Sequence, residues 1–289
     1  MKFPHLILLC AAGLTPLFPA AAQEEAKPAP AAAEAPTANA VPAMNGTLLL
    51  ILGESGEGAT PQQRAAGARQ LPPTLEEPEV TRLKAFAFGE RPGEFIPPLW
   101  HALVNDLLDA LLRQTRFRAR GAGWLLEMAE KSTDPVLRDY ALQKLPAAWR
   151  NAPAADQEKC LAALEKAAKD TSSSSAGTAL LSLNRLAARD RTLLAKAAEL
   201  ALAAAKDTSA PEAARSTALQ ICASRKDVRA APLARTILAD SAASVALRIS
   251  AAATLGRVGD ASDRPALESA ASDEALKPAA QAALDRLPQ

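Results

Sequence analysis

Segments with the periodicity of amphipathic helices recur along this chain, and their recurrence limits the folds that it can form. Three of them follow one another between Ser244 and Leu287, separated by Gly256-Arg257-Val258-Gly259-Asp260 and by Ser272-Asp273. Apolar residues three or four positions apart mark one buried face of a helix. Hydrophobic residues make up 49% of the chain but aromatic residues only 3%, so the apolar side chains are mostly Ala and Leu, which favour helices. We predict an all-α fold.

From Thr47 onward the whole chain can be written as pairs of helices joined by short polar connections, as antiparallel neighbours require. The first helices are less regular than the later ones. The predicted helices cover 48–52, 61–71, 76–88, 99–114, 118–131, 134–149, 156–169, 172–188, 190–206, 210–223, 227–239, 243–257, 263–271 and 274–287.

The second helices of these pairs share a pattern: a basic residue, a small or apolar residue three or four positions later, and an apolar residue seven positions later. The basic positions are Arg64, Arg138, Arg215, Arg248 and Lys277, with Ala176 in this place in one helix. The apolar positions Leu145, Leu183, Cys222, Leu255 and Leu284 follow one another in steps of 38, 39, 33 and 29 residues. Two helices and two turns fit in that length, and each pair alone would leave a hydrophobic face bare. We therefore expect the pairs to stack.

This pattern resembles HEAT repeats over residues 118 to 289, and in particular the short repeats of phycobilin lyase-like proteins. The motif at 255–260 (LGRVGD) carries the resemblance best, followed by the motif at 134–141 (DPVLRDYA). The resemblance implies a right-handed α-solenoid of antiparallel helix pairs, a HEAT/armadillo-like superhelix, over 117–289, with irregular helical pairs over 46–116. The chain as a whole resembles exported bacterial HEAT-repeat domain proteins. That family supplies protein-binding surfaces, so its resemblance implies binding and transfers no enzymatic activity.

The N-terminus has the pattern of an export signal. Lys2, an apolar run from Leu6 to Leu17 and the small residues 20–22 predict a signal peptide over 1–22 that is cleaved after Ala22. The run is too short to span a membrane, and we expect no transmembrane segment elsewhere. An alternative hypothesis is that Cys10 carries a lipid anchor. Residues 23–45 are rich in Ala and Pro and predict a disordered tether, so we expect a periplasmic or secreted protein.

Charge and motif content argue against several classes of ligand. Loss of Lys2 with the leader leaves equal numbers of basic and acidic residues, which disfavours nucleic acid as the main partner. The glycine-rich stretch 53–58 contains two acids and no following lysine, so we predict no nucleotide site and no cofactor. Five regularly spaced aspartates invite a metal-binding hypothesis, but each lies at a helix boundary, where capping is the stronger interpretation. They are Asp134, Asp170, Asp207, Asp240 and Asp273.

Cys160 and Cys222 are the cysteines that follow the predicted leader, and both fall at apolar helix positions. We expect them to be small buried core residues rather than a disulfide.

The most regular amphipathic segment, 99–114, carries the residues of an alternative hypothesis, a ligand-binding or enzymatic site within 76–120. His101, Asn105, Asp109 and Arg113 lie four positions apart opposite the apolar stripe, and Asp109 and Arg113 are spaced for an ion pair. His101 is the only histidine after the predicted leader, which leaves few ways to build a histidine-based metal site or a catalytic triad.

Large aromatic and basic residues provide candidates for partner recognition. Trp100, Trp124 and Trp149 are scarce aromatics that serve either as binding hot spots or as core residues. Arg116, Arg118 and Arg120 form a basic cluster that either binds an acidic partner or is a solvated turn. No catalytic constellation emerges, and we expect a non-catalytic scaffold or adaptor that binds another protein in the cell envelope. A further alternative is a tethered envelope structural protein.

Overall fold

A computed structural model describes residues 44–56, 58–170 and 172–287 of the chain. These residues form fourteen α-helices and five short 3₁₀ helices, and they contain no β-strand, which confirms the all-α prediction. From Met44 onward they belong to one compact unit. The predicted signal peptide and nearly all of the predicted tether lie outside the described residues.

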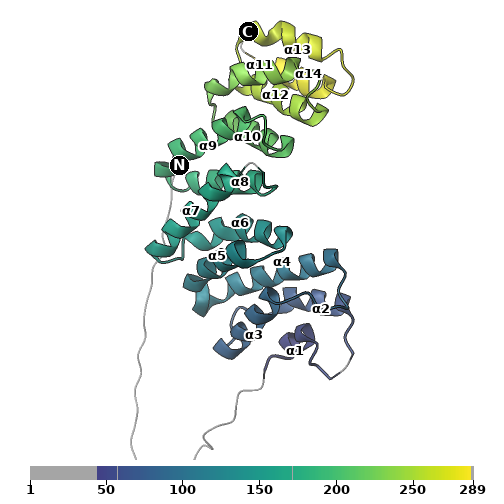
Figure 1. Cartoon of the computed structure of the whole chain (residues 1–289), viewed down its shortest axis with the longest axis vertical. Coiled ribbons are helices and arrows are strands. Elements are labelled where there is room, and N and C mark those ends of the chain that lie inside the picture. Colours follow the sequence, from purple (N-terminus) through teal and green to yellow (C-terminus); the bar gives the residue numbers. More distant parts are fainter. Residues whose placement is uncertain (1–43, 57, 171, 288–289) are drawn as a thin grey trace, which may run out of the picture. The chain divides into compact units, whose positions relative to one another are not determined.

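The helices follow the predicted order closely (Figure 1). The N-terminal helices are α1 (Gly46–Leu52), α2 (Pro61–Gly67), η1 (Ala68–Gln70), α3 (Glu77–Phe88), α4 (Pro97–Arg113), η2 (Thr115–Arg120), α5 (Gly121–Lys131) and α6 (Pro135–Trp149). The middle helices are α7 (Ala154–Lys169), α8 (Ala176–Ala187), η3 (Arg191–Leu193), α9 (Leu194–Lys206) and α10 (Glu212–Ser224). The last are η4 (Val228–Ala230), α11 (Ala231–Ala239), α12 (Val245–Val258), η5 (Ala261–Asp263), α13 (Arg264–Ala270) and α14 (Lys277–Leu284).

Extensive contacts join helices that are close in the chain. Consecutive helices pack as pairs, for example α5 with α6, α7 with α8 and α11 with α12. The even-numbered helices also form an unbroken series of contacts, from α2 through α4, α6, α8, α10 and α12 to α14. Any two α-helices in extensive contact are separated in the sequence by at most one other α-helix, so the core is built layer upon layer.

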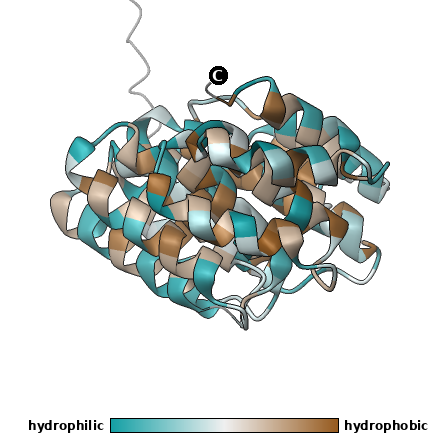
Figure 2. Ribbon diagram, turned by 90° about the horizontal axis from the view of Figure 1, so that it is seen from above, coloured by the Kyte–Doolittle hydropathy of each residue, from teal (hydrophilic) through white to brown (hydrophobic). Residues whose placement is uncertain are grey.

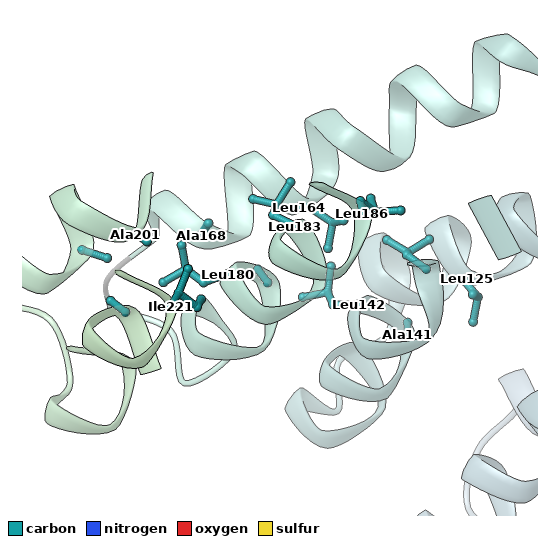
Figure 3. Close-up of a cluster of buried hydrophobic side chains, with 14 of the residues drawn as sticks. Leu125, Ala141, Leu142, Leu164, Ala168, Leu180, Leu183, Leu186, Ala201 and Ile221 are labelled. Atoms are coloured by element: carbon teal, nitrogen blue, oxygen red, sulfur yellow. The ribbon is translucent and has the colours of Figure 1, made fainter. Parts of the chain in front are cut away.

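The core consists mainly of leucine and alanine from these contacts. Figure 3 shows one part of it, where Leu125, Leu142, Leu164, Leu180 and other side chains from successive helices meet. Figure 2 shows hydrophobic and hydrophilic positions alternating around individual helices, as expected for amphipathic segments. Alanine at so many buried positions allows the helices to approach closely.

The starts of several helices differ from the prediction. A 3₁₀ turn precedes α5, α9, α11 and α13. At the first three it overlaps the start of a longer predicted helix, and at α13 it begins two residues before the predicted start at 263. Asp190, Asp227 and Asp260 begin three of these turns, and each side chain accepts a hydrogen bond from the backbone N–H two residues later. At the N-terminal end, Asn45 was placed in the tether but caps α1 and donates its N–H to Glu79 at 2.7 Å.

The repeated basic residue has a defined structural role. In four second helices its guanidinium donates to a backbone carbonyl at the C-terminal end of the preceding helix. These bonds are Arg64 Nε to Ile51 (2.9 Å), Arg138 Nη1 to Ser132 (3.0 Å), Arg215 Nε to Ala205 (3.3 Å) and Arg248 Nε to Leu238 (3.2 Å). The last carbonyls of a helix have no partner within the helix, and a cation there also interacts favourably with the partly negative end of the helix dipole. Each of these arginines thus ties the two helices of a pair together.

Side chains also bridge successive even-numbered helices. Pro146 lies inside α6 and has no N–H, so the carbonyl of Leu142 lacks its usual partner one turn later. Ser182 of α8 donates its hydroxyl to that carbonyl at 3.0 Å. Arg225, which follows α10, donates to both the carbonyl and the side chain of Asn184 in α8, at 2.8 and 2.7 Å. Polar groups in the core are thereby satisfied across the layers.

The glycine of the 255–260 motif serves close packing. A Cβ placed on Gly256 would lie 2.6 Å from Cα and 2.9 Å from Cβ of Ala283 in α14. No side chain, not even that of alanine, fits at this distance from another helix backbone. The motif that carries the resemblance to HEAT repeats is therefore explained by the α12–α14 contact.

We expect Arg248→Met to lower the free energy of unfolding by about 2 kcal/mol, because it keeps the apolar stem but removes the charged hydrogen bond to the Leu238 carbonyl and the 3.5 Å ion pair with Asp273. Arg257→Met is the matched control, since Arg257 lies on the same helix, is exposed and has no hydrogen bond or ion pair among the described residues. Chemical denaturation checks this. Equal losses in both variants would contradict the role given to the arginine–carbonyl bond.

We also expect Gly256→Ala to destabilise the protein by about 2 kcal/mol through overpacking against Ala283. Gly123→Ala provides the control, because a Cβ on that helical glycine meets only Asp156 Oδ2, at 3.9 Å. That substitution should stabilise by about 0.5 kcal/mol through helix propensity. A Gly256→Ala protein as stable as the parent would refute the close approach of α12 and α14.

Candidate functional site

Trp100 is the centre of an aromatic cluster at the start of α4. It is only 2% exposed, and it packs edge-on against Phe86 (ring centroids 5.4 Å apart) and Phe95 (5.8 Å). The guanidinium of Arg64 lies over the rings of Phe86 and Phe95, at 5.5 and 4.9 Å from their centroids. Trp100 therefore contributes to the core, and only its edge lines an open hollow.

His101 is held by the cap of another helix. Its Nε2 lies 2.7 Å from Asp134 Oδ2, while Asp134 Oδ1 accepts the N–H of Val136 at the start of α6. Burial alone would raise the pKa of Asp134, but the hydrogen bonds from His101 and Val136 bring this pKa below its ordinary value. The pair links α4 to α6 and fixes the orientation of the imidazole.

The other polar residues of α4 do not converge with His101. Asp109 Oδ1 accepts a hydrogen bond from Lys144 of α6 at 2.6 Å, and this ion pair replaces the predicted pair with Arg113. Arg113 is exposed and has no hydrogen bond or ion pair among the described residues. Asn105 is half-buried and lines neither of the hollows described below. The four residues of the predicted site are thus divided among separate environments.

The basic cluster is also divided. Arg116 forms an ion pair with Glu76, and Arg120 Nη1 lies 2.5 Å from Glu77 Oε1, so both arginines are tied to the N-terminal end of α3. The two arginines flank the buried ring of Phe117. Arg118 is exposed and has no hydrogen bond or ion pair from its side chain within the described part of the chain.

Two open hollows lie on this part of the molecule. The larger, about 510 Å³, has an apolar floor that includes Phe88, Trp100, Met128 and Leu137. Its rim carries both acidic and basic side chains. The rim includes Glu90, Arg91, Glu127, Lys131 and Asp134. Glu127 bonds to Lys84 at 2.5 Å and to Lys131 at 3.3 Å; the Lys84 hydrogen bond outweighs burial, so the pKa of Glu127 is lowered.

The smaller hollow, about 310 Å³, is formed where the C-terminal ends of α4 and α6 meet η2. It is lined by Asp109, Leu112, Arg113, Arg118, Ala147, Ala148 and Asn151. Arg113 and Arg118, whose side chains have no hydrogen bond or ion pair within the described residues, thus face the same space. The sequence could not place Asn151 or the α6 alanines beside them, because they come from another helix pair.

The remaining tryptophans belong to the border of the core. Trp124 and Trp149 are half-buried and pack against buried residues. The indole Nε1 of Trp149 is buried and has no hydrogen-bond partner among the described residues.

Cys160 and Cys222 are free and buried, as predicted. Burial, aided by the nearby Asp156 and Asp227 respectively, raises the pKa of both thiols to about 11. Neither is a thiolate near neutral pH, so neither has the character of a catalytic nucleophile.

The regularly spaced aspartates bond within their own turns, and two of them also pair with another helix: Asp134 with His101 and Asp273 with Arg248. Asp134, Asp207, Asp240 and Asp273 each accept a backbone N–H from two residues later, and Asp170 accepts the Ser172 hydroxyl. No group of three or more His, Cys, Asp or Glu residues in the described part of the chain is arranged to hold a metal ion. None of the helices described there is both long and apolar enough to cross a membrane.

Comparisons with known proteins find similarity at the level of structure. No protein-family model matches the sequence, and no curated protein matches it. A crystal structure described as an engineered protein of the Northeast Structural Genomics Consortium matches with 17% identity and a TM-score of 0.39. The match covers 84% of this chain and 96% of that one.

Asp134→Asn keeps the acceptor for Val136 but removes the carboxylate that faces His101, so we expect it to lower the free energy of unfolding by about 1 kcal/mol at pH 7. Because the pKa of Asp134 is lower in the folded chain, this contribution is complete above the ordinary value of 3.8 and is lost as the pH falls through the folded value. Denaturation curves between pH 7 and pH 2 should show the two proteins converging in acid.

Two further variants test the source of this effect. In a His101→Ala background Asp134→Asn should cost less, since the partner is already gone. Asp139→Asn, in the same helix and without a hydrogen bond or ion pair among the described residues, should leave stability almost unchanged. An unaltered cost of Asp134→Asn without His101 would contradict the pairing.

Proposed function

We propose that this chain is a non-catalytic scaffold or adaptor that binds another protein. The observation that carries the proposal is the layered contact pattern, in which each helix packs extensively only on helices close to it in sequence. Folds of this kind grow by adding layers, and they present long surfaces made from many helices. The separate pairing of His101 and Asp109 supports binding over catalysis, since the polar residues of α4 do not surround one reacting position.

The finer fold that we propose is a right-handed α-solenoid of antiparallel pairs, with HEAT-type repeats over 117–289. Its support is that Arg215 and Arg248, which occupy equivalent positions in the sequence pattern, both donate through Nε to the carbonyl ten residues earlier, at the end of the preceding helix. Arg138 also bonds to the end of its preceding helix, through Nη1 and to the carbonyl six residues earlier. Equivalent residues in equivalent contacts are what a structural repeat predicts. The irregular pairs over 46–116 would then form one end.

We place the protein in the cell envelope, periplasmic or secreted, on the basis of the residue pattern at 1–22. The intact mass of the exported protein tests this. A mature chain that starts at Gln23 fits an ordinary signal peptide, and a lipid-modified chain that starts at Cys10 fits an anchor. A full-length intracellular product would contradict both.

Affinity capture with the full chain, followed by direct binding measurements, tests the scaffold proposal. The chain should retain specific proteins from the envelope fraction of its native host, and at least one of them should bind the purified chain directly. His101→Ala should leave this binding intact, since His101 stabilises the α4–α6 junction. Failure of every captured protein to bind directly would overturn the proposal, and loss of a chemical activity with His101→Ala would favour the ligand-binding or enzymatic alternative within 76–120.

A further inference from the structure

The smaller hollow combines features of a binding site for carboxylates. Its apolar lining comes from the half-buried Leu112, the exposed Ala147 and the buried Ala148, and its polar lining comes from Arg113, Arg118, Asp109 and Asn151. Three different elements, α4, η2 and the end of α6, contribute to it. A hollow of about 310 Å³ accommodates one or two side chains of a partner.

The charge in this hollow is not balanced by the protein itself. Asp109 is neutralised by Lys144 at 2.6 Å, and the guanidinium groups of Arg113 and Arg118 have no ion pair with any residue that the structure describes. Each guanidinium carries five N–H donors, and neither side chain uses any of them within the described part of the chain. The neighbouring Arg116 and Arg120 differ, because each is paired with a glutamate of α3.

We infer that the Arg113–Arg118 hollow binds an acidic segment of the partner protein through its Asp or Glu carboxylates. Arginine suits this task because its planar fork matches the two oxygens of a carboxylate. The apolar lining of the hollow accepts the methylene groups of the partner's Asp or Glu side chains. This inference rests on the proposed scaffold function, and it specifies the chemistry of the partner and the place where it docks.

Two features predict how this binding behaves. Both arginines are exposed, so salt screens the attraction and affinity falls as ionic strength rises. Arg113 is also the last residue of α4, where its positive charge interacts favourably with the partly negative end of the helix. The net charge of the whole chain is only +1, so local placement rather than the overall field must hold an anionic partner.

Fluorescence anisotropy with the full chain and a labelled oligoglutamate peptide tests the inference. Arg113→Gln/Arg118→Gln should weaken peptide binding by about tenfold at low ionic strength, as two screened charge contacts would. An oligoglutamine peptide should bind to neither protein. Absence of oligoglutamate binding to the parent chain would overturn the inference.

Arg257→Gln/Arg286→Gln is the matched control, because both residues are exposed, have no hydrogen bond or ion pair from their side chains among the described residues and remove the same charge elsewhere. It should change peptide affinity by less than about twofold. Equal weakening in both double variants would show a general charge effect and would overturn the site. A single-stranded oligonucleotide that binds more tightly than the peptide and depends on the same two arginines would overturn the assignment to protein carboxylates.

Capture experiments separate this inference from the scaffold proposal. If the parent chain binds a partner directly and Arg113→Gln/Arg118→Gln binds it equally well, the scaffold stands and this docking site falls. If no partner binds directly while the peptide results hold, the scaffold proposal fails and an anion-binding hollow remains. Unchanged circular dichroism and unfolding midpoints of both double variants establish that they are folded.

Discussion

In four of the helix pairs, a bond from a second-helix arginine to the end of the first helix joins the two helices. A helix ends with carbonyl groups that have no partner in the helix, and a short connection brings the next helix close to them. Arg138, Arg215 and Arg248 reach back and satisfy one such carbonyl each, at 3.0 to 3.3 Å. The same positive charge is attracted to the partly negative end of the helix dipole. A single residue type at one position thus links the paired helices.

The pair α7–α8 shows what happens without that arginine. Ala176 occupies the position, and no guanidinium caps the end of α7 from there. Polar side chains of this pair bond to the preceding layer, Ser182 to the Leu142 carbonyl and Arg189 to the Pro146 carbonyl, as Arg225 also does in the pair that carries Arg215. Pro146 creates the need for the first of these bonds, because it removes an N–H from α6. Different residues therefore hold one layer on the next and hold the two helices of a pair together. Both sets do so by donating hydrogen bonds to backbone carbonyls that lack a partner within their own helix.

This use of charge also explains how the candidate site arises. Most charged side chains around α4 bind neighbouring helices: His101 binds Asp134, Asp109 binds Lys144, and Arg116 and Arg120 bind glutamates of α3. Such residues orient helices and are poorly available to a ligand. Arg113 and Arg118 remain, and the fold places both beside one hollow. The binding that we propose therefore uses Arg113 and Arg118, the charged side chains that do not pair with neighbouring helices here.

The helices themselves were predictable because helix formation depends on local periodicity and on signals that lie within a few residues. Thr60 and Gln63 form a capping box at α2, and Asp134 and Ser244 cap α6 and α12. The predicted boundaries missed the 3₁₀ turns that precede α5, α9, α11 and α13, since a 3₁₀ turn and the first turn of an α-helix share the same residue preferences. The buried positions of Cys160 and Cys222 also followed from the local pattern.

The sequence by itself thus determined the helical segments, their order and the recurrence of their core positions, because these depend on residues close together in the chain. Only the tertiary structure decided which charges neutralise one another. His101 and Asp134 lie 33 residues apart, and Lys144 and Asp109 lie 35 apart, so their meeting depends on how helix pairs stack. For the same reason the local spacing of Asp109 and Arg113 predicted an ion pair that a residue from another helix took over. Long-range geometry, which no local pattern encodes, left Arg113 and Arg118 unpaired in one hollow.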